Sequence, residues 1–234
     1  MINQDKLHFE KTVLPNGHIL YTQASDLPVT YARIVIPVGN SQAITLNPHC
    51  DGGYFHFLEH MCFEPSVGYP DKTAYQTLLA ETGSSLNACT DAYHTEYMFE
   101  APAETFSTSF PAFIDHIVSP AFNEADIVLQ KGIITNERTQ RKYFPGYDEL
   151  SQYVLTKWMN NYYYSREQLF VSDASLEAIS QGTLQNIHQY YFNKPISIFV
   201  AGTFDTQTII ELLNLLPHTP SPTNLQSYPY SLME

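Results

Sequence analysis

Residues 56–60 read His-Phe-Leu-Glu-His and place the strictest requirement on the fold. On a helix, residues four apart lie one above the other, so His56 and His60 present two imidazoles on one face. Glu59 lies beside that face. The flanking residues are phenylalanine, leucine and methionine, so this helix is expected to be buried on most sides. Three buried ionisable groups need a partner, which other segments of the chain must supply.

A divalent metal ion is the partner that two imidazoles one turn apart predict. A hydrolytic zinc site takes three protein ligands and keeps one position open, so a third ligand has to come from elsewhere. Glu59, set slightly to the side, is where a base that activates water belongs. The candidates for the third ligand are Glu137, His94, Glu100 and Cys62. Glu137 ranks first because it lies on a strongly predicted helix among isoleucines, where a carboxylate is partly buried.

Strands and helices alternate along the chain in a pattern typical of an α+β fold. Alternating apolar residues, with a Pro-Asn-Gly turn at 15–17, predict strands at 13–21 (a hairpin), 29–38, 85–90, 95–99 and 196–200. Helical spacing and capping residues predict helices at 53–63, 71–82, 106–117, 123–137 and 150–158. A further helix is predicted after a cap at Thr183, and a last one from Asp205 or Thr206 to Leu216. We expect one mostly antiparallel or mixed sheet with helices on one face.

The domain organisation follows from the end of the last helix. Residues 1–217 are predicted to form one domain, and residues 218–234 a linker-like tail, because Pro, Ser and Asn cluster there without apolar periodicity.

The charge composition restricts which kinds of molecule this chain is expected to bind. The chain has 11 Lys and Arg against 24 Asp and Glu, a formal net charge of −13, so it repels nucleic acid and favours basic peptides. No apolar run approaches eighteen residues, so a membrane span is not expected. The three cysteines show no CxxC pair and no secretory signal is visible, which predicts a cytoplasmic protein.

These motifs together resemble the family of pitrilysin, insulin-degrading enzyme and the mitochondrial processing peptidase, whose His-x-x-Glu-His helix is the inverzincin pattern. The resemblance extends over nearly the whole chain, through HFLEHMCFEPS, GSSLNACTDAYHTEYMFEAP, FIDHIVSPAF and FVAGTFD. It implies a zinc metalloendopeptidase that cleaves short unfolded peptides by metal-activated water. It also implies that His56, His60 and Glu137 hold Zn²⁺ and that Glu59 is the general base.

The same resemblance places Asn87 and Ala88 on an edge strand that pairs with the substrate backbone. Family members commonly carry a glutamate seven residues before the ligand glutamate, and here Gln130 stands at that place. An amide keeps the hydrogen bonding and loses the charge, so Gln130 is expected near the metal but not as a ligand.

Two other functions remain open on the sequence. Family members usually have a second, similar domain, so this chain needs a second domain or partner subunit, or else is a catalytically weak or silent assembly subunit. A zinc-dependent small-molecule lyase would take a cysteine as the third ligand, either Cys89 or Cys50.

Overall fold

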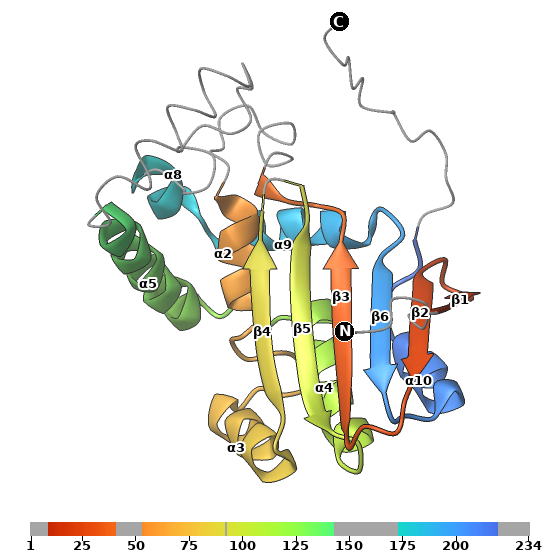
Figure 1. The fold of residues 1–234 in the computed structure, drawn as a ribbon. Coiled ribbons are helices and arrows are strands. Elements are labelled where there is room, and N and C mark those ends of the chain that lie inside the picture. The colour runs from red at the N-terminus through yellow and green to blue at the C-terminus, as the bar shows by residue number, and fades with distance from the viewer. Residues whose placement is uncertain (1–8, 41–52, 92, 143–172, 220–234) are drawn as a thin grey trace, which may run out of the picture.

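The computed structural model describes residues 9–40, 53–91, 93–142 and 173–219. Its strands form a single six-stranded sheet in the order β1-β2-β6-β3-β5-β4 (Figure 1). Only the β2–β6 pair is parallel, and the four other neighbouring pairs are antiparallel. The strands are β1 (Glu10–Val13), β2 (Ile19–Ala24), β3 (Val29–Ile36), β4 (Ser85–Thr90), β5 (Thr95–Pro102) and β6 (Ser197–Gly202).

Helices cover one face of this sheet and extend beyond its β4 edge (Figure 1). The described α-helices are α2 (Tyr54–Met61), α3 (Lys72–Thr82), α4 (Phe106–Val118), α5 (Glu124–Lys142), α8 (Asp173–Ala178), α9 (Gln181–His188) and α10 (Thr206–Leu213), with a 3₁₀ turn over Gln189–Phe192. The predicted α+β class, with a mixed sheet and one helical layer, is confirmed. None of the helices in the described residues combines the length and apolarity that crossing a bilayer requires.

Capping residues begin and end the helices largely as predicted. The Asp71 carboxylate accepts two backbone hydrogen bonds at the start of α3, and Gly83 ends that helix with a φ of 63°. Asp205 caps α10, which ends at Leu213, three residues earlier than predicted. The prediction that Thr183 caps α9 was wrong. Ser180 is the cap and accepts from the Thr183 N–H, because the helix begins one residue after Ser180.

The first hairpin is hydrogen-bonded to the end of α10 and the segment that follows it. Gly17, at a φ of 89°, makes the turn that an L side chain would strain. The Asn16 side chain is buried in that turn and donates from Nδ2 to the carbonyls of Leu213 (2.9 Å) and Leu216 (3.2 Å). The segment after α10 is therefore fastened to the start of the chain. Most of the predicted tail, residues 220–234, and the helix predicted at 150–158 lie outside the described residues.

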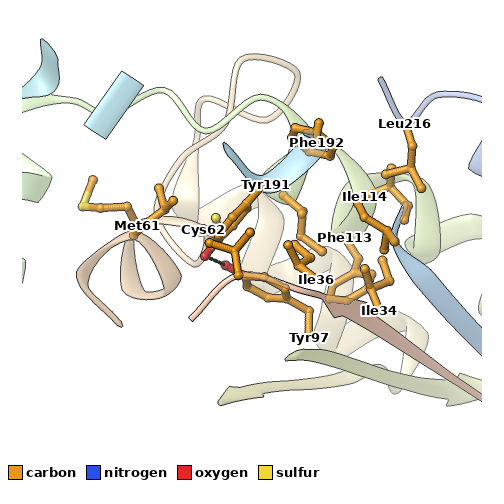
Figure 2. Packing of buried hydrophobic residues seen from close by; sticks show 14 of the residues in the cluster. Ile34, Ile36, Met61, Cys62, Tyr97, Phe113, Ile114, Tyr191, Phe192 and Leu216 are labelled. Atoms are coloured by element: carbon orange, nitrogen blue, oxygen red, sulfur yellow. Dashed lines mark hydrogen bonds between the residues drawn. The ribbon is translucent and has the colours of Figure 1, made fainter. Parts of the chain in front are cut away.

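The core lies between the sheet and its helices (Figure 2). Alternate strand residues point into it, and the aromatic face predicted for residues 106–117 packs there. The Phe99 ring, for example, stacks on Phe113 with ring centroids 4.9 Å apart. Four α2 side chains in this core are completely buried: Phe55, Phe57, Leu58 and Met61. Burying each is worth about 1.5–3 kcal/mol, so α2 cannot rotate about its axis without large cost. The orientation of its polar side chains is set by this packing.

Candidate metal centre

His56 and His60 converge at one point on α2. Their Nε2 atoms lie 3.2 Å apart, and the two rings are nearly perpendicular, with centroids separated by 4.7 Å. Both side chains are largely buried, at 14% and 16% exposure. The apolar packing of α2 leaves this face of the helix as the one turned away from the core. The predicted pairing of the two imidazoles is therefore present.

Glu137 reaches the same point from the middle of α5. One carboxylate oxygen lies 3.7 Å from His56 Nε2, and the other lies 3.7 Å from His60 Nε2. Zinc–nitrogen and zinc–oxygen bonds of about 2.0–2.2 Å in a tetrahedron put ligand atoms about 3.3–3.6 Å apart. The three separations are close to that spacing. Two imidazole nitrogens and a carboxylate aimed at one small space fit a zinc ion.

Glu59 adds a second carboxylate on the neighbouring side. It offers an oxygen that lies within 4.8 Å of the metal-binding atoms of both His56 and His60. The side chain is only 7% exposed, and its Oε2 accepts a 2.6 Å hydrogen bond from the Thr90 hydroxyl on β4. Burial raises the pKa of Glu59, while the bond from Thr90 and the nearby His60 oppose that rise. The carboxylate is thus held in a fixed orientation beside the imidazole pair.

Gln130 lies two turns before Glu137 in α5. It is buried, and its Oε1 lies 2.9 Å from His60 Nδ1. Since a carbonyl oxygen only accepts, His60 must carry its proton on Nδ1. The Nε2 lone pair is then directed toward His56 and Glu137. A metal-binding histidine usually donates its other N–H in this way, so the predicted position of Gln130 beside the centre agrees with the geometry.

The other candidates for the third ligand are engaged elsewhere. His94 bonds Asp91 and Glu96, each at 2.8–2.9 Å. Glu100 accepts from Ser85 on the outer part of the sheet. Cys62 is buried in the core, and burial raises the pKa of its thiol to about 12, so it remains protonated.

The cysteines proposed for a lyase find no support at the centre. Cys89 is exposed on β4 and precedes Thr90, so its side chain points to the opposite face of the sheet from the hydroxyl that bonds Glu59. Cys50 lies outside the described residues.

Asn87 and Ala88 lie on β4, which is the edge strand of the sheet. The Asn87 side chain is exposed, and its Oδ1 accepts from the Ala88 N–H at 2.9 Å. Because this N–H bonds a side chain rather than a strand, it is a donor that another extended chain can use. The strand that carries these residues also carries Thr90, so the exposed edge and the Glu59 carboxylate are joined by one element.

Sequence reasoning missed three residues that contact the centre or its neighbours: Thr90, Glu64 and Lys72. Thr90 sits at an inward position of the alternating strand 85–90, and Glu64 follows the apolar run after the helix. The alternating pattern of residues 85–90 indicated only that Thr90 faces inward. The pairing of β4 with β5 and the contact of β4 with α2 show that Thr90 faces Glu59. Glu64 and Lys72 carry no local signal that links them to Gln130.

Comparison with known proteins gives a family and a fold. Residues 20–169 match the model of the insulinase family, peptidase family M16. The peroxisomal insulin-degrading enzyme-like 1 of Arabidopsis thaliana is 34% identical over 128 residues, which are 54% of this chain and 13% of that protein. The uncharacterized zinc protease YmfH of Bacillus subtilis is 26% identical over 196 residues, 80% of this chain and 42% of that protein. The chain therefore spans less than half the length of these curated relatives.

Solved structures share the fold at low identity. The first half of the periplasmic protease PqqL from Escherichia coli superposes with a TM-score of 0.77 and 19% identity, covering 92% of this chain and 48% of that one. A peptidase M16 inactive domain from Pseudomonas fluorescens superposes with a TM-score of 0.78 and 15% identity, covering 92% and 52%. The fold, the His-x-x-Glu-His helix and the matching family model agree, and the chain belongs to the insulinase family, peptidase family M16.

Proposed function

We propose that this chain is a zinc-dependent metalloendopeptidase domain that hydrolyses short unfolded peptides. The observation that carries the proposal is the convergence of His56 and His60 on α2 with Glu137 on α5, which lies 77 positions after His60. Membership of a peptidase family whose relatives include named zinc proteases supports the same reaction.

In this proposal His56, His60 and Glu137 hold the zinc ion. Zinc held by such a set supplies a Lewis acid that activates water and polarises a peptide carbonyl. Glu59 is the general base: its carboxylate takes a proton from the attacking water and returns it to the leaving amine. The Thr90 hydroxyl donates to Glu59 Oε2 over 2.6 Å, and this hydrogen bond holds the carboxylate beside the imidazoles.

The substrate is proposed to bind along β4. An edge strand binds extended peptide through backbone hydrogen bonds and so demands little of the peptide's sequence. A peptide carbonyl would take the place of the Asn87 Oδ1 that now accepts from the Ala88 N–H. The net charge of −13 favours basic peptides over acidic ones.

A second, similar domain or a partner subunit is proposed to complete the enzyme. Two findings support this: the chain covers about half of the solved neighbours, and one of those is the first half of a protease. We propose residues 1–217 as the zinc-bearing domain, because the hydrogen bonds from Asn16 close it at Leu216, and residues 218–234 as a linker-like tail.

A cytoplasmic location stays a prediction. Relatives and neighbours are named for the peroxisome and the periplasm, and fractionation of cells that express the intact reading frame is its test.

The test of the function combines metal analysis with a quenched-peptide assay, run with and without a candidate partner chain of the same family. We expect about one zinc per chain, and cleavage that Glu59→Gln lowers by about 10²–10⁴-fold with zinc content unchanged. Glu81→Gln, an exposed carboxylate on α3, is the matched control and should cleave normally. Zinc-loaded protein that cleaves nothing in a peptide library, even with its partner, would instead identify a silent assembly subunit.

A further inference from the structure

An ion pair with a buried carboxylate lies directly behind the candidate metal centre. Glu64, just after α2, is only 2% exposed, and both of its carboxylate oxygens accept from Lys72 Nζ, at 2.7 and 2.6 Å. The same Glu64 Oε1 also accepts from Gln130 Nε2 at 2.6 Å. Gln130 in turn contacts His60. A continuous path of hydrogen bonds therefore runs from Lys72 on α3, through Glu64 and Gln130, to His60.

We propose that Glu64, anchored by Lys72, is a positioning residue that orients the Gln130 amide and through it holds His60 in the tautomer that can accept a metal ion at Nε2. This inference rests on the proposed function, because it concerns how the same centre is prepared. It assigns a role to two residues that contact no metal-binding atom themselves.

The contact with Glu64 fixes the direction of the Gln130 amide. An ionised carboxylate only accepts hydrogen bonds, so the group of Gln130 that faces Glu64 must be the NH₂. The amide carbon then turns Oε1 to the opposite side, where His60 Nδ1 lies 2.9 Å away. Without Glu64, nothing in these contacts prevents the amide from rotating by half a turn and presenting its NH₂ to His60.

The direction of the amide sets the tautomer of His60. Facing Oε1, His60 Nδ1 must be the protonated nitrogen, and Nε2 keeps its lone pair. Facing an NH₂ instead, Nδ1 would become the acceptor and the proton would move to Nε2. That tautomer places a hydrogen in the space shared with His56 Nε2, 3.2 Å away, and with the Glu137 carboxylate. The direction of the Gln130 amide thus decides whether His60 Nε2 offers a lone pair or a hydrogen atom to the space beside His56 and Glu137.

Lys72 holds the Glu64 carboxylate in place. A buried carboxylate without a partner is costly, and one that no cation held in place could move away from the Gln130 amide. Lys72 begins α3, and its ammonium group spans both Glu64 oxygens while its side chain stays 39% exposed. Lys72 thereby fixes the Glu64 carboxylate in the position from which its Oε1 accepts from Gln130 Nε2.

A purely structural role would tie α2, α3 and α5 together and affect stability alone. The deciding measurement is therefore the tautomer of His60, read from the ¹⁵N chemical shifts of its imidazole nitrogens in the metal-free 234-residue chain. We expect Nδ1–H in the wild type and a shift toward Nε2–H in Glu64→Leu. Zinc affinity, measured by chelator competition, should fall by about 10- to 100-fold in the same variant.

Two further variants separate positioning from folding. Glu64→Asp retains a carboxylate that only accepts hydrogen bonds, so it should keep the wild-type tautomer and most of the affinity. Leu213→Ala, a fully buried site on α10, should lower the melting temperature while leaving the tautomer and zinc affinity unchanged. If Glu64→Leu does not fold, Gln130→Met leaves the Glu64–Lys72 pair intact and should release His60 from the Nδ1–H form.

The outcomes distinguish this inference from the proposed function. A Glu64→Leu protein, or a Gln130→Met protein in its place, with the wild-type His60 tautomer overturns the inference even if zinc binds and peptides are cleaved. Wild-type protein that binds no zinc overturns the proposed function, and the tautomer comparison in metal-free protein still decides the inference.

Discussion

Zinc binding should raise the thermal stability of this chain through the two helices that it links. His56 and His60 belong to α2 and Glu137 to α5, so an ion held by all three joins segments 77 residues apart. A ligand that binds only the folded state stabilises it by RT ln(1 + [L]/Kd), which is about 2.7 kcal/mol at a free zinc concentration 100 times the dissociation constant. For a chain of this length that corresponds to a rise in melting temperature of about 5–11 °C.

Glu137→Gln is the perturbation that tests this reasoning. If loss of the carboxylate weakens zinc binding about 100-fold, the same free zinc equals the new dissociation constant. The stabilisation then falls to RT ln 2, about 0.4 kcal/mol, and the shift to about 1–2 °C. Differential scanning fluorimetry in zinc-buffered solution and in chelator measures both shifts.

The control for this experiment lies on the same helix. Glu124→Gln changes a carboxylate in the first turn of α5, far from the imidazoles, and should keep the full zinc-dependent shift. The reasoning is refuted if Glu137→Gln retains a shift equal to that of the wild type at the same free zinc, because the third ligand would then be another residue.

Three further perturbations test the surroundings of the centre. Thr90→Val removes the hydrogen bond to Glu59, and a bond to a charged group is worth about 1.5–3 kcal/mol. We therefore expect kcat to fall by about 10- to 150-fold while the zinc content stays unchanged. Thr90→Ser keeps the hydroxyl and should restore kcat. Asn16→Ala leaves the carbonyls of Leu213 and Leu216 without their donor and should lower the free energy of unfolding by about 2–4 kcal/mol. Urea denaturation measures this change. An unchanged urea midpoint would show that the hairpin does not hold the segment after α10 in place. Burial lowers the pKa of three histidines below the ordinary 6.5: His18, His116 and His188. The unfolded chain therefore takes up protons below about pH 6.5 before the folded chain does, so stability in chelator should be constant above that pH and fall as the pH is lowered to about 5.5. A urea midpoint that rises on acidification would contradict this sign.

Much of the candidate centre could be predicted from local sequence. The four-residue spacing of His56 and His60 needs only the helical repeat, and the apolar flanks of the motif indicate which face is buried. The place of Asn87 on an edge strand came from the resemblance to a known family. Thr90 could not be assigned a partner, because strand alternation gives a direction but not the element that lies in it.

The strand pairing of the sheet, too, could be predicted only in part from local sequence. The hairpin of β1 and β2 and the β4–β5 pair join neighbours in sequence through short turns, so their pairing follows from local signals. β6 lies between β2 and β3, and the β2–β6 pair is parallel, although these strands lie near opposite ends of the chain. No local pattern specifies that insertion, which depends on burying Ile198 and Val200 at the centre of the sheet.

The chain's own pattern determined the two imidazoles, the neighbouring Glu59 and the strand that carries the exposed edge, because helical and strand periodicity act over a few residues. The sequence and the family resemblance put Glu137 first among the candidate carboxylates, but only the tertiary structure placed it opposite the imidazoles and placed Glu64 and Lys72 behind Gln130. Those contacts join α2, α3 and α5, and their geometry is set by how the helices bury their apolar faces together, a long-range property that spacing along the chain does not encode.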